Sequence, residues 1–165
     1  MAFATRADLL ARSNARRLAQ LAVPADRAMV PDDALRVAIA GGSLAGYSAD
    51  DQVAIAEALD AIDKALADAD ALILSYGIPD TVQTTLLARL ASTIALYYLQ
   101  GAERMTKEVE SAYNGAVATL KAHAEGKMSL IPAAPTDPLP SSDLAIITSN
   151  PARYGAGDTD NEVGL

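Results

Sequence analysis

The chain has no cysteine and no tryptophan, and phenylalanine occurs once in its 165 residues. Without cysteine it cannot form a disulfide, a thiolate nucleophile or a cysteine-ligated metal site, which fits a reducing compartment. Aromatic residues make up 4% of the chain, whereas alanine supplies much of its 51% hydrophobic content. This composition favours closely packed helices over a β-sheet.

Long apolar runs and an excess of basic charge are also missing. No stretch approaches the roughly 18 apolar residues of a membrane span, and the N-terminal segment lacks the apolar core of a signal peptide. Thirteen basic and 21 acidic residues give a formal net charge of −8, which disfavours nonspecific binding to phosphate backbones or anionic membranes. We therefore expect a soluble protein without a membrane partner, built as one domain and a tail.

Helix-capping residues predict three short helices in the first 40 residues. The capping or starting positions are Thr5, then Ser13 or Asn14, and then Pro31 with Asp32 and Asp33 behind it. Pro24 should end the second of these helices. A glycine-rich stretch at residues 41–46 follows, but it lacks the Lys-Ser/Thr of a P-loop, so we interpret it as a connection between helices.

The strongest periodic pattern predicts a long amphipathic helix. Its apolar stripe, at spacings of four and three, consists of Ile55, Leu59, Ile62, Leu66, Ala69, Ile73 and Tyr76. Gly77 and Pro79 should end this helix, and Asp80 or Thr81 should cap the next one. The apolar face expected for that next helix contains Val82, Leu86, Leu87, Leu90, Ile94 and Tyr97. With Arg89 as its one formal charge, it should be buried on several sides, by the bundle or by a neighbouring subunit.

The last predicted helix is capped by Thr106 and terminated by Gly126. Its inward-facing residues are expected to be Val109, Tyr113, Ala116, Val117 and Leu120. The predicted fold is therefore all-α: a compact antiparallel helical bundle over residues 1–130.

Residues 131–165 are predicted to form an extended arm, because four of the first ten are proline and cannot continue a helix. A short β-prone run at residues 144–148 would need a partner strand from another chain, with disorder of the free monomer as the alternative. The candidate contact residues of this arm are Leu144, Ile146, Ile147, Arg153 and Tyr154.

The N-terminal region is locally basic, although the chain as a whole is acidic. The N-terminal region contains Arg6, Arg12, Arg16 and Arg17, with Asp8 as the one acidic residue among them. This patch is either a solvated helix face or a contact surface.

Residues that could support catalysis are few. His123 is the sole histidine, so neither a zinc or di-iron site nor a Ser-His-Asp triad can be assembled convincingly, and we expect it at a helix C-terminus. The carboxylate pairs fit helix caps, and Tyr97 with Tyr98 fits packing better than base stacking. We expect neither enzymatic activity nor a cofactor.

Four segments occur in an order that resembles the Mu-like phage head-to-tail connector family. They are Phe-Ala-Thr-Arg-Ala-Asp-Leu-Leu-Ala-Arg at residues 3–12, Ile-Leu-Ser-Tyr-Gly-Ile-Pro at 73–79, the Leu87-to-Tyr97 stretch, and the run from Tyr113 through Gly126-Lys127 to Ser129-Leu130. The family-like core positions in the last two segments are Leu87, Ile94, Tyr97, Tyr113 and Leu120.

The resemblance implies a structural virion protein of the phage neck, also called an adaptor or head-completion protein. Such a protein forms a ring, usually a dodecamer, between the portal and a tail-side neck or tail terminator protein. Viral DNA passes through the ring without sequence-specific binding. The expected location is the virion neck, and the host cytoplasm during assembly.

Two other function classes stay open. One is a small helical interaction or regulatory module that docks a partner helix, which predicts a monomer or dimer. The other is an enzyme with an unrecognised carboxylate site, which predicts a buried acidic cluster with shifted pKa values.

Overall fold

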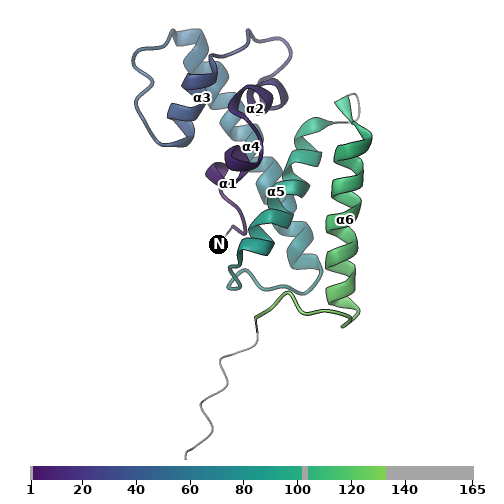
Figure 1. The fold of residues 1–165 in the computed structure, drawn as a ribbon. Helices are drawn as coiled ribbons and strands as arrows, with labels where there is room; N and C mark the ends of the chain where they lie inside the picture. Colours follow the sequence, from purple (N-terminus) through teal and green to yellow (C-terminus); the bar gives the residue numbers. More distant parts are fainter. Residues whose placement is uncertain (1, 102–103, 133–165) are drawn as a thin grey trace, which may run out of the picture. The chain divides into compact units, whose positions relative to one another are not determined.

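The computed structural model describes residues 2–101 and 104–132, and in this part of the chain every regular element is a helix. The elements are α1 (Arg6–Arg12), α2 (Ala15–Ala22), α3 (Asp32–Ile39), α4 (Ala49–Ser75), α5 (Thr85–Gln100) and α6 (Lys107–Ala124). The long α4 runs through the middle, α2 and α3 pack against its first half, and α5 returns along its second half, with α1 packed mainly against α5 (Figure 1). α6 then packs mainly against α5. The all-α prediction is confirmed for these residues.

Most of the capping residues predicted from the sequence do cap their helices. The Thr5 hydroxyl accepts the Asp8 amide at 3.2 Å, while the Asp8 carboxylate accepts the Thr5 amide at 2.8 Å. The Thr5 hydroxyl also donates to the Asp8 carboxylate at 2.7 Å, and this bond, followed by the one from the Thr5 amide, lowers the pKa of Asp8. Asn14, and not Ser13, caps α2 by accepting the Arg17 amide at 2.7 Å. Thr106 caps α6 as predicted.

The predicted start of α5 was wrong. Its cap is Thr84, whose hydroxyl accepts the Leu87 amide at 3.1 Å. The residues before it form a turn, in which the Val82 amide donates to the Pro79 carbonyl and the Gln83 amide group donates to the Asp80 carbonyl. Because the helix begins later than expected, Val82 lies in this turn and Leu86 is 43% exposed.

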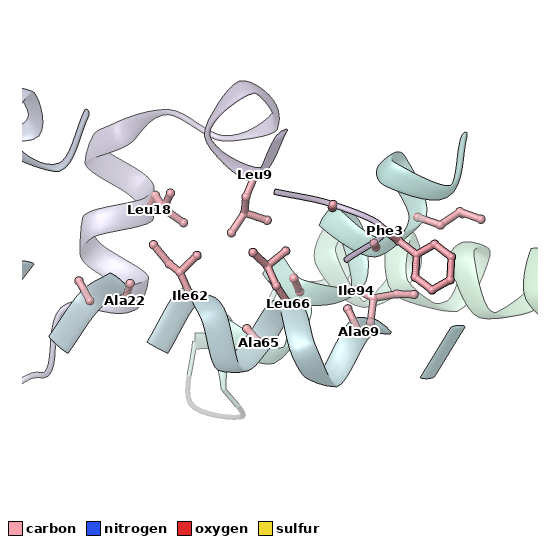
Figure 2. Packing of buried hydrophobic residues seen from close by; sticks show 14 of the residues in the cluster. Phe3, Leu9, Leu18, Ala22, Ile62, Ala65, Leu66, Ala69 and Ile94 are labelled. Carbon is pink, nitrogen blue, oxygen red and sulfur yellow. The ribbon is translucent and has the colours of Figure 1, made fainter. Parts of the chain in front are cut away.

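The core follows the predicted stripe of α4. Ile55, Ile62 and Ile73 are fully buried, and Figure 2 shows Ile62, Ala65, Leu66 and Ala69 along the side of α4 that meets the N-terminal segments. Alanines supply much of the remaining contact, with Ala58, Ala69, Ala91 and Ala95 at 0% exposure. Side chains this small let α4 and α5 approach closely.

The N-terminal segment is anchored to α4 by both apolar and polar contacts. Phe3 belongs to the same buried cluster as Ala69 and Ile94 (Figure 2). Its backbone amide donates to the Asp70 carboxylate at 3.0 Å. Burial outweighs this hydrogen bond and raises the pKa of Asp70.

α6 is less deeply packed than predicted. Of the five residues expected to face inward, Ala116 and Leu120 are buried, whereas Tyr113, Val109 and Val117 are partly exposed. Two of the four residues of its last turn carry or can carry positive charge, which suits a helix C-terminus. They are Lys121 and His123, so His123 lies where the sequence placed it.

The chain turns back after α6 and rejoins the core. Gly126 adopts φ 71°, a left-handed conformation that favours glycine. The Leu130 amide then donates to Nδ1 of His123 at 3.3 Å, and the Leu130 side chain is 5% exposed. The described helices include none long and apolar enough to cross a membrane. The arm prediction, with Leu144, Ile146, Ile147, Arg153 and Tyr154, falls outside the described residues.

Adjacent leucines at the start of α5 offer a matched test of this packing. Leu87→Ala should lower the free energy of unfolding by about 2–5 kcal/mol, because it opens a cavity at a fully buried position. Leu86→Ala should cost less than about 1 kcal/mol, because Leu86 is 43% exposed and its truncation opens no buried cavity. Urea unfolding followed by circular dichroism measures both. Equal losses would contradict the observed start of α5.

Candidate interaction surface: an arginine-lined groove

The corner between α1 and α2 meets the connection between α5 and α6 and forms two adjoining hollows. The larger, about 760 Å³, is lined by Asn14, Arg16, Arg17, Gln20, Leu21, Met29, Arg104 and Thr106. The smaller, about 440 Å³, is lined by Ala11, Arg12, Ser13, Asn14, Arg17, Leu96, Gln100 and Val109. Asn14 and Arg17 line both hollows, so we treat them as one surface, the arginine groove.

Gln100 holds the two sides of the arginine groove together. Its side chain is almost completely buried, at 6% exposure, near the end of α5. The Gln100 amide nitrogen donates to the Arg104 carbonyl, and its oxygen accepts from Nη2 of Arg17 at 3.5 Å. The Arg104 guanidinium in turn donates to the Gln20 carbonyl on α2. These bonds fix the α5–α6 connection against α2.

The arginine groove concentrates positive charge without paired carboxylates among the described residues. Arg12, Arg16, Arg17 and Arg104 contribute four guanidinium groups, and the described residues that line the two hollows include no acidic one. Asn14 and Thr106 cap the N-termini of α2 and α6, whose positive dipole ends therefore also lie at this surface. The arrangement is suited to binding an anionic group.

The predicted four-arginine patch is not a single surface, because Arg6 is committed elsewhere. Arg6 forms a two-pronged ion pair with Asp63 on α4, with Nε 2.7 Å from the carboxylate. This bond lowers the pKa of Asp63. Arg12, Arg16 and Arg17 do lie together, and the structure adds Arg104 to them.

Sequence reasoning missed Arg104 and Gln100. They are 87 and 83 residues from Arg17 in the chain, and only tertiary packing brings them to it. A glutamine near the end of an apolar helix was the one available signal, because a buried amide requires hydrogen-bond partners.

Tyrosines fill the interface between α5 and α6. The rings of Tyr97 and Tyr113 stack with centroids 3.9 Å apart and an interplanar angle of 15°. Tyr98 meets both rings edge-on, at 5.9 and 6.2 Å. Burial, assisted by a hydrogen bond with Tyr113, raises the pKa of Tyr98 to about 12. Tyr97 and Tyr113 therefore each use one ring face against the other, which fits the predicted packing role.

The five family-like core positions divide into two groups. Leu87, Ile94 and Leu120 are fully buried. Tyr97 and Tyr113 are partly exposed at the edge of the core, where they stack on each other.

Acidic pairs serve local structure in the described part of the chain. Asp32 and Asp33 lie in the first turn of α3, and Asp33 accepts the Tyr47 hydroxyl at 2.9 Å. Asp50 and Asp51 lie in the first turn of α4, where carboxylates favour the positive helix end. Within residues 2–101 and 104–132, no three histidine, aspartate or glutamate side chains come together as metal ligands.

A further hollow lies between α5 and α6. It has a volume of about 300 Å³ and is lined by Leu86, Arg89, Leu90, Thr93, Ala112, Gly115, Ala116 and Thr119. We call it the lateral groove. Its α6 side consists of small residues, so an approaching chain can come close to the helix backbone.

Comparison with known proteins places most of the chain in one family. The family described as "Bacteriophage Mu, Gp36" matches residues 3–149. The match includes the whole helical bundle, with both grooves, and continues into the C-terminal segment. No curated protein sequence matches the chain.

Replacing Gln100 with methionine keeps the volume of the side chain but removes its hydrogen bonds. Gln100→Met should lower the free energy of unfolding by about 1–2 kcal/mol, because the bonds to Arg17 and Arg104 are lost at a buried position. Gln83→Met is the matched control, since exposed Gln83 makes one local bond, and its effect should stay within about 0.5 kcal/mol. Chemical denaturation measures both variants. Similar values would contradict a linking role for Gln100.

Proposed function

The chain belongs to the bacteriophage Mu Gp36 family, and from this membership we propose that the phage protein is a structural component of the virion neck. It acts as a head-to-tail connector, a ring between the portal and a tail-side neck or tail terminator protein. The match over residues 3–149 is the observation that carries the proposal. In this role the protein works by stoichiometric assembly, without catalysis or a cofactor, in the host cytoplasm and then in the virion.

The lateral groove supports self-assembly. α6 has 18 residues, yet Ala116 and Leu120 are its buried ones, so most of its surface is available to another chain. Beside it, Leu86 presents an apolar side chain that is 43% exposed. We assign this face to the neighbouring copy in the ring. In a closed ring, many identical contacts act together, so each can be modest.

The acidic balance supports a passive relation to DNA. A formal net charge of −8 on each copy multiplies in a ring and repels phosphates at close range. DNA therefore slides through the lumen without sequence-specific binding. The neck role thus requires contacts to proteins and avoidance of stable contacts to the genome.

Gly115 allows the lateral contact to be blocked with little risk to the fold. A side-chain carbon added at Gly115 meets nothing within 4 Å, and replacing a helical glycine improves helix propensity by up to about 1 kcal/mol. Gly115→Arg should therefore leave the monomer folded but prevent ring formation. Negative-stain microscopy with and without the phage portal, together with circular dichroism, measures both properties.

The matched control for this test is Asn114→Arg, which adds the same side chain at an exposed residue of α6 outside the lateral groove. This variant should still form rings. Rings formed by Gly115→Arg would show that neighbours meet through another face. A wild-type protein that stays a monomer or dimer even with the portal would instead support the interaction-module alternative.

The C-terminal segment provides a second, separate test. The buried core lies entirely between Phe3 and Leu130 among the described residues, so removing residues 133–165 should leave the helical circular-dichroism signal largely intact. The same deletion should abolish docking to the portal, because Leu144, Ile146 and Ile147 would no longer be available for strand pairing. Co-sedimentation with portal particles measures docking. Unchanged docking would contradict the arm hypothesis.

A further inference from the structure

We propose that the arginine groove of one copy receives the acidic end of the next copy in the ring, so that each contact pairs opposite charges. The acidic end is the surface around the first turns of α3 and α4. Its exposed carboxylates are those of Asp26, Asp32, Asp33 and Asp50. The inference rests on the ring of the proposed function and names two surfaces that meet in it.

The arginine groove continues the lateral groove along α5. The α5 residues that line the two grooves include Arg89 and Thr93 in the lateral groove, and Leu96 and Gln100 in the arginine groove. These four residues follow one another at spacings of four, three and four, which places them on one face of the helix. A neighbouring copy that covers the lateral groove can therefore extend over the arginine groove as well.

The arginine groove offers exposed guanidinium groups to another chain. They come from α1, α2 and the connection before α6, and they belong to Arg12, Arg16, Arg17 and Arg104. In the described part of the chain, none of them forms an ion pair with a carboxylate, in contrast to Arg6 with Asp63. Guanidinium groups bind carboxylates through paired N–H donors, so the groove is suited to an acidic surface.

The acidic end gathers carboxylates from separate segments of the chain. Residues 24–57 contain six acidic and two basic residues. Asp33, in the first turn of α3, accepts the hydroxyl of Tyr47 at 2.9 Å, and Tyr47 lies just before α4. The beginnings of α3 and α4 are therefore held next to each other, and their acidic first turns form one surface.

Arg27 does not neutralise this surface. Its Nε and Nη2 donate to the Glu57 carboxylate on α4 at 3.0 and 2.7 Å. The pKa of Arg27 is raised mainly by this bond and further by the negative charges of Asp26 and Asp50. Because Arg27 is paired with Glu57, the acidic end keeps its excess of negative charge.

A ring of acidic copies needs opposite charges at its contacts. Each copy has a formal net charge of −8, so two copies repel each other unless complementary patches meet. α3 and α6 lie on different sides of the bundle (Figure 1). Each copy can therefore present its acidic end to one neighbour and its grooves to the other, which is the heterologous contact that a ring requires.

Duplex DNA is the competing ligand of the arginine groove, and the charge balance favours the protein partner. A net charge of −8 opposes the approach of a duplex from solution. The carboxylates of a second copy belong instead to a chain that the lateral groove already holds, which raises their effective concentration at the arginines.

Charge reversal tests the pairing in the full-length protein. Arg12→Glu with Arg16→Glu reverses charge in the arginine groove, and Asp26→Lys with Asp32→Lys reverses it at the acidic end. All four side chains are exposed, so circular dichroism should show folded proteins. Each double variant brings like charges together and should reduce ring formation with the portal by at least about tenfold. Negative-stain microscopy and analytical ultracentrifugation measure the rings.

Combining all four substitutions in one chain separates a specific pairing from a general effect of charge. The combined variant has the wild-type formal net charge of −8, and opposite charges again face each other at every contact. It should therefore form rings at close to the wild-type level. Raising the salt from about 0.1 to about 1 M shortens the screening length from about 10 to about 3 Å and should reduce the difference between the double variants and the wild type.

Two matched controls change the net charge by the same amounts at other exposed positions. Lys121→Glu with Lys127→Glu lies toward the end of α6, away from the arginine groove. Asp60→Lys with Asp68→Lys lies on α4, outside the acidic end. Both control variants should still form rings.

The outcomes distinguish the pairing from the ring itself. Rings formed by either double variant, loss of rings in the controls, or a combined variant that forms none would overturn the pairing and leave the ring role intact. A wild-type chain that forms no ring with the portal would overturn both. Duplex DNA that binds the wild type at physiological salt, and not the Arg12→Glu, Arg16→Glu variant, would assign the groove to nucleic acid instead; fluorescence anisotropy measures this binding.

Discussion

Covering one face of α4 is the constraint on which the rest of the structure depends. A helix from Ala49 to Ser75 carries a continuous apolar stripe, and none of the other described helices is of comparable length. The chain covers this stripe with α2 and α3 on the first half and α5 on the second, while α1 packs mainly against α5. The alanines in both α4 and α5 permit the close approach that makes up for the scarcity of large aromatic side chains.

The same constraint explains the opening motif of the chain. Phe3 and Ala4 are buried against α4, Thr5 caps α1, Asp8 completes the capping box and Leu9 returns to the core. Each residue of this short run therefore has a separate physical task in joining the N-terminus to the central helix. The segment that resembled a family motif in the sequence therefore connects the N-terminus to α4 and begins the helical bundle.

Features determined by neighbouring residues could be predicted from the sequence, and those determined by tertiary contacts could not. Thr5 and Thr106 were recognised as caps, and the stripe from Ile55 to Ile73 was recognised as core, because local hydrogen bonding and periodicity decide both. The start of α5 was misplaced because Asp80 and Thr81 are equally plausible caps, and the turn at Pro79–Val82 decides against them. The arginine groove was found only in part, since Arg104 and Gln100 join it through packing between distant segments.

The shallow packing of α6 divides the molecule into two tiers of stability. α6 contributes two buried side chains and rests mainly on α5, whereas α4 and α5 contribute most of the fully buried residues. Local opening costs least where few apolar contacts must be broken. α6 can therefore detach and return many times during the lifetime of the folded core, so its amide protons exchange with solvent earlier than those of α4. α6 can therefore change its position at a lower cost in free energy than α4 and α5 can.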